Sequence, residues 1–129
     1  EWTRKAAEQG DATAQFNLGM MHSEKFGIQK NPAESLKWLR KAADQRHVQA
    51  MNTLGSLYET GQAGVKRNPV FAHMLFDASA KKGDSTAVAR RQALEKSLSA
   101  SDIRASKELA RKWKPGANLE KALGGGISS

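Results

Sequence analysis

The sequence predicts an all-α protein, an α-solenoid in which antiparallel helix pairs stack in the order of the chain. Two observations support this fold class. A pattern of residues recurs after 36 or 37 positions, and a period of this length is typical of repeat architectures. The chain is also rich in alanine, poor in β-branched residues, and carries only 8 aromatics among 129 residues. This composition favours thin layers of helices packed through small side chains.

The repeat is clearest around two tryptophans. Residues 38–45 read Trp-Leu-Arg-Lys-Ala-Ala-Asp-Gln, and residues 2–9 read Trp-Thr-Arg-Lys-Ala-Ala-Glu-Gln. In the same register Leu54-Gly55 aligns with Leu18-Gly19. One residue is then inserted, so that later parts of the repeat align at an offset of 37. Each repeat therefore combines one helix that carries Leu-Gly with a second that carries the Trp-Leu pattern.

Helix boundaries follow from turn and capping residues. Asn31-Pro32 and Asn68-Pro69 predict helix starts, because Asn caps free amides and Pro at the first position loses no hydrogen bond. Gly10 and Gly83 stand where such a helix should end in a left-handed turn. Arg46 replaces that glycine in the middle repeat, so we expect a different turn there. The other helix of each pair is predicted over residues 12–24, 47–60 and 84–98.

Two glycines occupy the interior of predicted helices. Gly19 and Gly55 share one repeat position, although glycine costs about 1 kcal/mol relative to alanine inside a helix. We therefore expect that neighbouring helices approach closely at both sites. By the same periodicity, the core is predicted to contain five large side chains: Trp38, Leu39, Leu54, Leu57 and Leu75.

The pattern Ala-x-x-x-Leu-Gly-x-x-(His/Tyr), Gly-(Ile/Val)-x-x-Asn-Pro and Trp-Leu-x-Lys-Ala-Ala-x-Gln resembles the Sel1-like repeat family, which is related to tetratricopeptide repeats. The resemblance covers about residues 2–98 and implies a Sel1-like, TPR-like solenoid. The stretch from Ala100 to Pro115 is similar to the terminal helix that closes many bacterial members. Five of its residues would fold back over the final repeat: Ile103, Ala105, Leu109, Ala110 and Trp113.

These boundaries predict a single Sel1-like repeat domain over residues 1–116. It would consist of a partial repeat at 1–10, repeats at about 11–46 and 47–83, and a degenerate repeat with the capping helix at 84–116. Residues 117–129 are predicted to form a flexible tail. Because Trp2 stands where Trp38 stands, we expect either that residues before Glu1 are missing or that a short helix serves as a cap.

Residues for catalysis or for holding a cofactor are not predicted. The chain has no cysteine, which excludes disulfides, thiolate zinc sites and cysteine nucleophiles but does not identify the compartment. His22, His47 and His73 lack the three- or four-residue spacing that puts two imidazoles on one helical face. No nucleophile elbow, phosphate-binding loop or dinucleotide motif is present. No run approaches the roughly 20 apolar residues of a membrane span.

The resemblance implies a protein that binds another protein or peptide on a concave face lined by the first helix of each repeat. Phe16 and Met20 would be apolar anchors there, or ordinary core if an upstream repeat covers them. The family also suggests an extracytoplasmic, often periplasmic, setting, with roles in envelope regulation or as an immunity protein to a secreted toxin. The predicted partner-binding residues are Thr13, Phe16, Met20, Gln49, Asn52, Ser56 and Glu59.

Charge supports an alternative function. Residues 1–78 carry 10 Lys/Arg against 8 Asp/Glu, whereas residues 79–129 carry 11 against 5. Such a basic half attracts nucleic acid, anionic surfaces or acidic proteins, but it is also what a solvated helix surface looks like. Few exposed aromatics are expected in this half to stack bases, which counts against single-strand recognition. The residues concerned are Arg90, Arg91, Arg104, Lys107, Arg111, Lys112 and Lys114.

Overall fold

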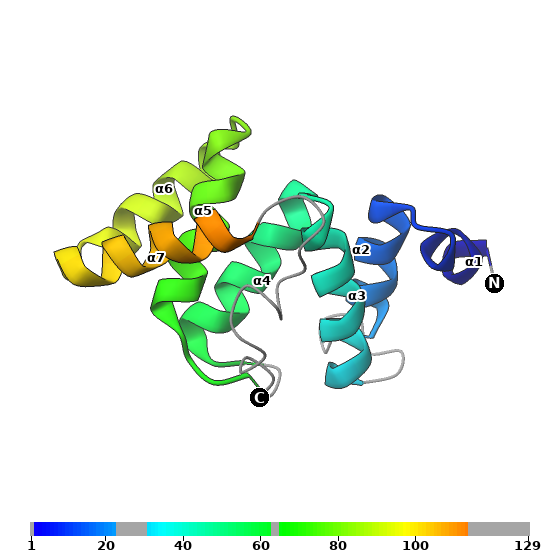
Figure 1. Cartoon of the computed structure of the whole chain (residues 1–129). Coiled ribbons are helices and arrows are strands. Elements are labelled where there is room, and N and C mark those ends of the chain that lie inside the picture. Colours follow the sequence, from blue (N-terminus) through cyan, green and yellow to red (C-terminus); the bar gives the residue numbers. More distant parts are fainter. Residues whose placement is uncertain (1, 23–30, 63–64, 114–129) are drawn as a thin grey trace.

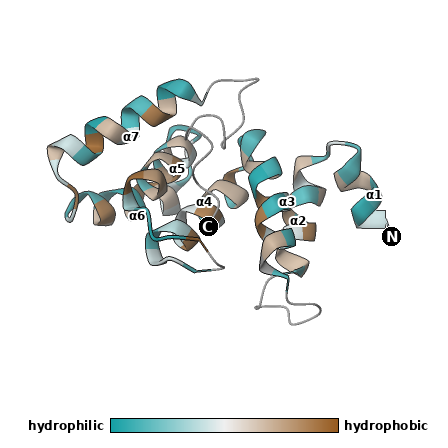
Figure 2. Ribbon diagram, turned by 60° about the horizontal axis from the view of Figure 1, so that its bottom comes forward, coloured by the Kyte–Doolittle hydropathy of each residue, from teal (hydrophilic) through white to brown (hydrophobic). Residues whose placement is uncertain are grey.

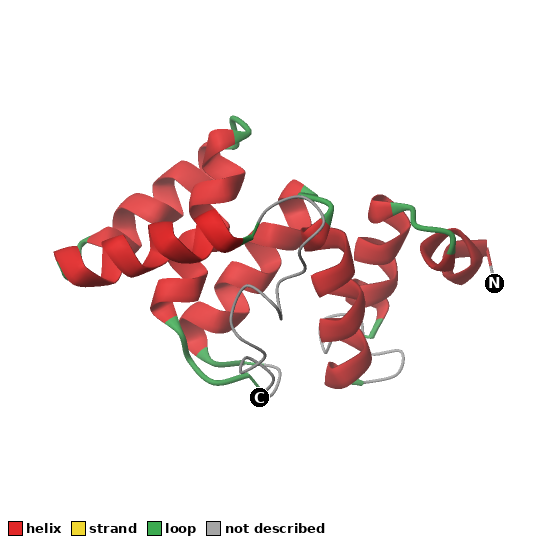
Figure 3. Cartoon of the chain, viewed as in Figure 1, coloured by secondary structure: helices red, strands yellow, loops and turns green. Residues whose placement is uncertain are grey.

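The computed structural model describes residues 2–22, 31–62 and 65–113, and these residues form seven helices with no strand among them (Figure 3). The predicted tail and Lys114 lie outside the described residues. The helices are α1 (Trp2–Glu8), α2 (Ala12–Met21), α3 (Pro32–Asp44), α4 (Val48–Thr60), α5 (Pro69–Lys81), α6 (Ser85–Glu95) and α7 (Ala100–Lys112).

The first six helices stack in chain order, each packed against the next, in the described part of the chain (Figure 1). This arrangement confirms the all-α solenoid. The predicted starts of α2, α4 and α6 are correct to within one residue. The predicted end of α6 at residue 98 is wrong, because the helix stops at Glu95 and Ser97 donates its backbone N–H to the Leu94 carbonyl in a tight turn. Residues 23 and 24, the predicted end of α2, are not among the described residues.

Side-chain caps explain where the helices begin. The Asn31 and Asn68 side chains accept the backbone N–H of Glu34 and Phe71, and Pro follows each Asn at the first helical position. The predicted Asn-Pro helix starts are therefore confirmed. Ser99 and Asp102 form a reciprocal capping box at the start of α7. Each such cap contributes about 1 kcal/mol.

The turn after α3 differs from our expectation. Gly10 and Gly83 have φ of +102° and +95°, but Arg46 also adopts a left-handed φ of +63°. The backbone bond that closes the turn is preserved, since His47 N–H donates to the Ala42 carbonyl at 3.1 Å. The prediction of a different turn was therefore wrong. Left-handed backbone costs about 1–2 kcal/mol for a residue with a Cβ, and here the contacts of the Arg46 side chain offset it.

The close approach predicted at the two helical glycines is confirmed. A Cβ on Gly55 would lie 2.8 Å from two ring carbons of Phe76 on α5. A Cβ on Gly19 would lie 2.9 Å from Leu39 Cγ and 3.1 Å from the Ser35 carbonyl oxygen of α3. In both repeats, the following helix occupies the volume that a larger residue would need.

The main hydrophobic core runs through α3, α4 and α5 and extends to Leu94 of α6 and to Trp113. A smaller cluster joins Ala7, Ala14 and Leu18 to Trp38 at the N-terminal end. Of the five predicted core side chains, Leu57 is half-buried against the main core and the other four are buried.

The last helix, α7, folds back and packs on α5 (Figures 1 and 2). Trp113 is buried, and Leu109 and Ala110 pack partly against the main core, as predicted. Ala105, however, is exposed, and Ser106 is buried in its place. The packed side chains recur every three or four residues, which sets one helical face, and Ala105 falls to the side of that face.

Candidate partner-binding face

The predicted partner-binding residues lie on α2 and α4, the helices that open the two complete repeats. Thr13 and Gln49 are exposed. The other five are half-buried: Phe16, Met20, Asn52, Ser56 and Glu59. The structure therefore places the whole predicted set on two neighbouring helices with part of each side chain at the surface.

Phe16 connects α2 to α4. Its ring stacks on His47, with centroids 5.0 Å apart and planes 27° from parallel. Phe16 and Met20 both pack partly against the main core and keep part of their surface exposed. Each therefore supports the joint between repeats while part of its apolar surface stays exposed, and the role of partner anchor stays a prediction.

Asn52 and Ser56 connect α4 to α6. The Asn52 amide donates to Asp84 Oδ2 at 3.0 Å, and the Arg90 guanidinium donates to Ser56 Oγ at 3.0 Å. Arg90 also lies 5.8 Å from the centroid of the Phe76 ring. The sequence reasoning missed Asp84. Its place directly before α6 was a signal that it caps that helix.

His47 caps α4 where Asp11 and Asp84 cap α2 and α6 at the same repeat position. Its Nδ1 accepts the Ala50 backbone N–H at 3.2 Å, which requires an unprotonated nitrogen. Burial, with a smaller contribution from Lys82, lowers the pKa of His47 below 6.5, and Asp11 opposes that shift. The α2–α4 joint therefore carries a titratable cap.

We expect the protein to lose stability as the pH falls below about 6.5, and His47→Asp to remove part of that loss. The folded-state pKa is the lower one, so the unfolded chain binds the proton first and acid favours unfolding. The aspartate cap should be about 0.5–1 kcal/mol more stabilising at pH 5.5. Urea unfolding at pH 7.5 and 5.5 measures this, with His22 and His73 present in both proteins. Equal pH dependence of the two proteins would contradict the role of His47.

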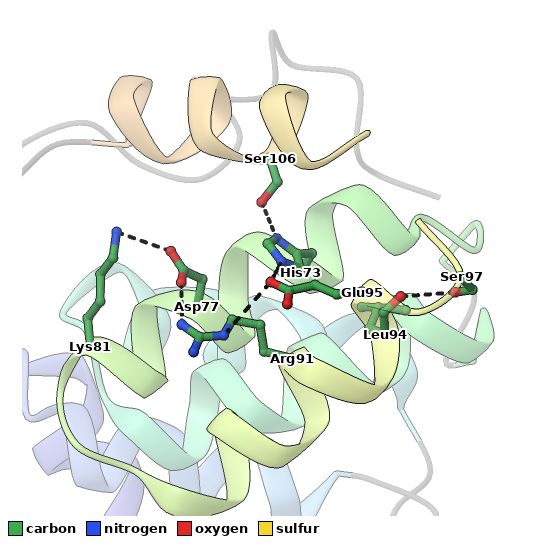
Figure 4. Close-up of polar contacts among 8 residues, drawn as sticks. All are labelled: His73, Asp77, Lys81, Arg91, Leu94, Glu95, Ser97 and Ser106. Carbon is green, nitrogen blue, oxygen red and sulfur yellow. Dashed lines mark hydrogen bonds and ion pairs between the residues drawn. The ribbon is translucent and has the colours of Figure 1, made fainter. Parts of the chain in front are cut away.

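A polar network around the buried His73 joins α5, α6 and α7 (Figure 4). His73 Nδ1 lies 2.7 Å from Ser106 Oγ, and its Nε2 lies 2.7 Å from Glu95 Oε2. Hydroxyl, imidazole and carboxylate also form the line used by serine hydrolases. Here His73 and Ser106 are each 2% exposed, so a substrate does not reach the hydroxyl. The network holds α7 on α5.

The same network continues along α5. Arg91 donates to Asp77 Oδ1 at 2.8 Å, and Lys81 lies 3.1 Å from Asp77 Oδ2. Burial alone would raise the pKa of Asp77, but the hydrogen bonds from Arg91 and Lys81 outweigh it and lower that pKa. Sequence reasoning missed this network. The signal was in the register, since His73 stands at the position of Leu36, and Arg91 at that of Leu54.

Trp113 closes the opposite end of α7. Its indole Nε1 donates to Asp44 Oδ1 at 3.1 Å, and its ring lies 3.6 Å under the Arg46 guanidinium carbon. Arg46 also donates to the Trp113 carbonyl and to the Asp44 carbonyl. The terminal helix is thereby fixed to the turn between α3 and α4.

The basic residues of the alternative function are partly engaged. Arg91 pairs with Asp77, Arg111 pairs with Glu108, and Arg90 donates to Ser56. Within residues 2–22, 31–62 and 65–113, no group of three or more acidic or histidine side chains could hold a metal ion. None of the described helices has the length and apolar character needed to cross a membrane.

Comparison with known proteins supports the repeat architecture. The putative sel1-like repeat-containing protein L18 of Acanthamoeba polyphaga mimivirus is 40% identical over 47 residues, 36% of this chain and 8% of that protein. Chitin synthase regulatory factor 2 of Schizosaccharomyces pombe is 28% identical over 81 residues, 63% of this chain and 16% of the relative. The chain therefore spans only a small part of these relatives.

Two solved structures are similar over most of the chain. The antigen c5321 of uropathogenic Escherichia coli, which has an SLR fold, superposes with a TM-score of 0.80 and 31% identity, covering 95% of this chain and 26% of that chain. A Sel1 repeat protein from Oxalobacter formigenes superposes with a TM-score of 0.64 and 42% identity, covering 70% and 37%.

The family model described as Sel1 repeat matches residues 1–11, 12–47 and 48–84, which together make up most of the chain. Proteins with these repeats generally mediate protein–protein interactions, and the repeat is typically a non-catalytic interaction module. The chain belongs to the Sel1 repeat family.

Proposed function

We propose that this chain is a non-enzymatic adaptor that binds a segment of a partner protein across the face formed by α2, α4 and α6. One observation carries the proposal. Residues of these helices fall into rows when the repeats are aligned at offsets of 36 and 37. Thr13, Gln49 and Thr86 form one such row, and all three are exposed.

Direct contacts tie the three helices of this face to one another. The Phe16–His47 stack joins α2 to α4, and the Asn52–Asp84 hydrogen bond joins α4 to α6. Stacked repeats of this kind create extended surfaces with a fixed spacing between equivalent side chains. A partner segment would meet apolar surface from Phe16 and Met20 first, and polar groups beyond them. Aromatic and methionine side chains are frequent anchors at such interfaces.

Photo-crosslinking tests this face. A benzoylphenylalanine in place of Gln49 should capture the partner, whereas the same residue in place of Lys41, exposed on α3, should not. Gln49→Arg combined with Thr13→Arg should weaken binding of the captured protein by about tenfold or more, because two bulky charges would enter the interface. Capture from position 41 alone, or unchanged affinity of the double variant, would count against the proposal.

Two narrower roles belong to the same proposal: envelope regulation and immunity to a secreted toxin. One of the similar proteins, chitin synthase regulatory factor 2, is by its name a regulatory factor of a chitin synthase, which supports a regulatory role. An immunity role would make the partner a toxin encoded beside this gene. Cells that produce this toxin should then grow again when the present chain is co-expressed with it. The Gln49→Arg/Thr13→Arg variant should fail to restore that growth. Rescue that is insensitive to the double variant would remove the immunity role from this face.

A further inference from the structure

In the C-terminal part of the described chain, each carboxylate already binds another group of the same chain. Asp84 caps α6, Glu95 holds His73, Asp102 completes the capping box, and Glu108 pairs with Arg111. These four are all of the acidic residues between positions 79 and 113. The surface of α6 and α7 therefore has no free carboxylate in this part of the structure to neutralise its cations.

Several exposed cations on the same surface form no ion pair with a carboxylate within the described ranges. Arg104 and Lys107 are exposed, and no hydrogen bond or ion pair joins them to another residue within the described ranges. Lys112 is also exposed, but it lies close enough to Glu108 to help lower the pKa of that carboxyl. Arg104, Lys107 and Arg111 follow one another at spacings of three and four residues, so they share one helical face. That face extends about 10 Å along the helix axis.

The scaffold beneath this face is firmly anchored. Ser106 and Trp113 lie on the opposite side of α7, where both are buried against the rest of the domain. Figure 2 shows the hydrophilic character of α7 where it lies over the more hydrophobic α5. An anchored helix holds its charges at fixed spacing, which reduces the entropy lost when a partner binds.

We propose that the exposed face of α7 is a second interaction surface and that it takes an acidic segment of a partner protein. Carboxylates of that segment pair with Arg104 and Lys107, the two cations of this face that form no ion pair within the described ranges. This surface is independent of the proposed face on α2, α4 and α6, and either can fail without the other.

Two features favour a protein over a nucleic acid here. Glu108 lies beside the cations on the exposed face of α7. Its carboxylate is held by Arg111 and would repel a continuous phosphate backbone. Helices α6 and α7 also contain no aromatic residue, whereas single-stranded nucleic acids are generally held by stacking on aromatic rings. A mixed-charge surface with isolated cations matches spaced carboxylates better than a uniform polyanion.

The test compares two variants of equal charge. Arg104→Glu/Lys107→Glu alters the proposed surface, and Lys5→Glu/Lys66→Glu alters exposed lysines elsewhere. Each variant replaces two positive side chains with negative ones, so the formal net charge falls from +8 to +4 in both proteins. The probe is a fluorescent helical peptide with glutamates at positions i, i+3 and i+7, together with its glutamine counterpart. Circular dichroism establishes that both variants remain folded.

Anisotropy titrations should show that the glutamate peptide binds and that the glutamine peptide does not. The α7 variant should lose about tenfold in affinity, and the control variant no more than about twofold. Equal losses in both variants would reduce the effect to net charge and overturn the proposal. Tighter binding of oligouridylate or of phosphatidylserine vesicles, lost in the same α7 variant, would overturn it in favour of a polyanion site.

Discussion

Trp113→Ala is expected to lower the free energy of unfolding by about 3 kcal/mol. Trp113 is only 4% exposed, and its removal would leave a cavity under the Arg46 guanidinium and deprive Asp44 of the indole donor. Trp2→Ala is the matched control. Its side chain is 85% exposed, so the same substitution there should change stability by less than about 0.5 kcal/mol.

Urea unfolding followed by circular dichroism measures both effects, and hydrogen exchange shows where the first one acts. We expect the amides of α7 to lose protection first, because Trp113 and Ser106 are its two fixed points on the domain. A Trp113→Ala protein as stable as Trp2→Ala would show that α7 contributes nothing to the packing of the domain.

The strained turn provides a second measurement on the same site. Arg46 keeps its left-handed backbone while its side chain contacts Trp113. Once Trp113 is removed, the strain of about 1 kcal/mol is no longer offset. Arg46→Gly should therefore stabilise the Trp113→Ala protein and destabilise the parent protein. The same effect in both backgrounds would mean that the two residues are not coupled.

Repeat register accounts for the parts of the fold that sequence reasoning predicted well. Identical residues 36 or 37 positions apart serve the same local purpose, so Asn31 and Asn68 cap helices and Gly19 and Gly55 admit a neighbour. These are short-range requirements, and a pattern of residue types contains them directly. The candidate face on α2, α4 and α6 comes from the same register and stays a prediction.

The features that were missed depend on contacts between distant parts of the chain. Arg46 was expected to change its turn because a residue with a Cβ disfavours positive φ. The largest compensating contact comes from Trp113, which is 67 residues away in the sequence. Likewise Ser106 was unremarked because its partner His73 is 33 residues away. The repeat alignment indicated that His73 stands at the core position of Leu36. A polar residue at a core position predicts that it has a hydrogen-bond partner, but it does not identify which residue that partner is.

Gly55→Ala is expected to lower the free energy of unfolding by about 1–2 kcal/mol, although alanine is the better helix former. The gain in helix propensity is about 1 kcal/mol, while overpacking of a tight core costs about 1–3 kcal/mol. The overpacking term should win here, because the new methyl group would lie 2.8 Å from the Phe76 ring and that ring is fully buried.

Two further variants separate these terms by urea unfolding. In a Phe76→Leu protein the two clashing ring carbons are absent, so Gly55→Ala should become neutral or stabilising there. The third repeat offers the complementary control, since Gln92 is exposed at the position equivalent to Gly55. Gln92→Gly should destabilise by about 1 kcal/mol through propensity alone. If Gly55→Ala were stabilising in the parent protein, close approach would not be the reason for glycine at this position.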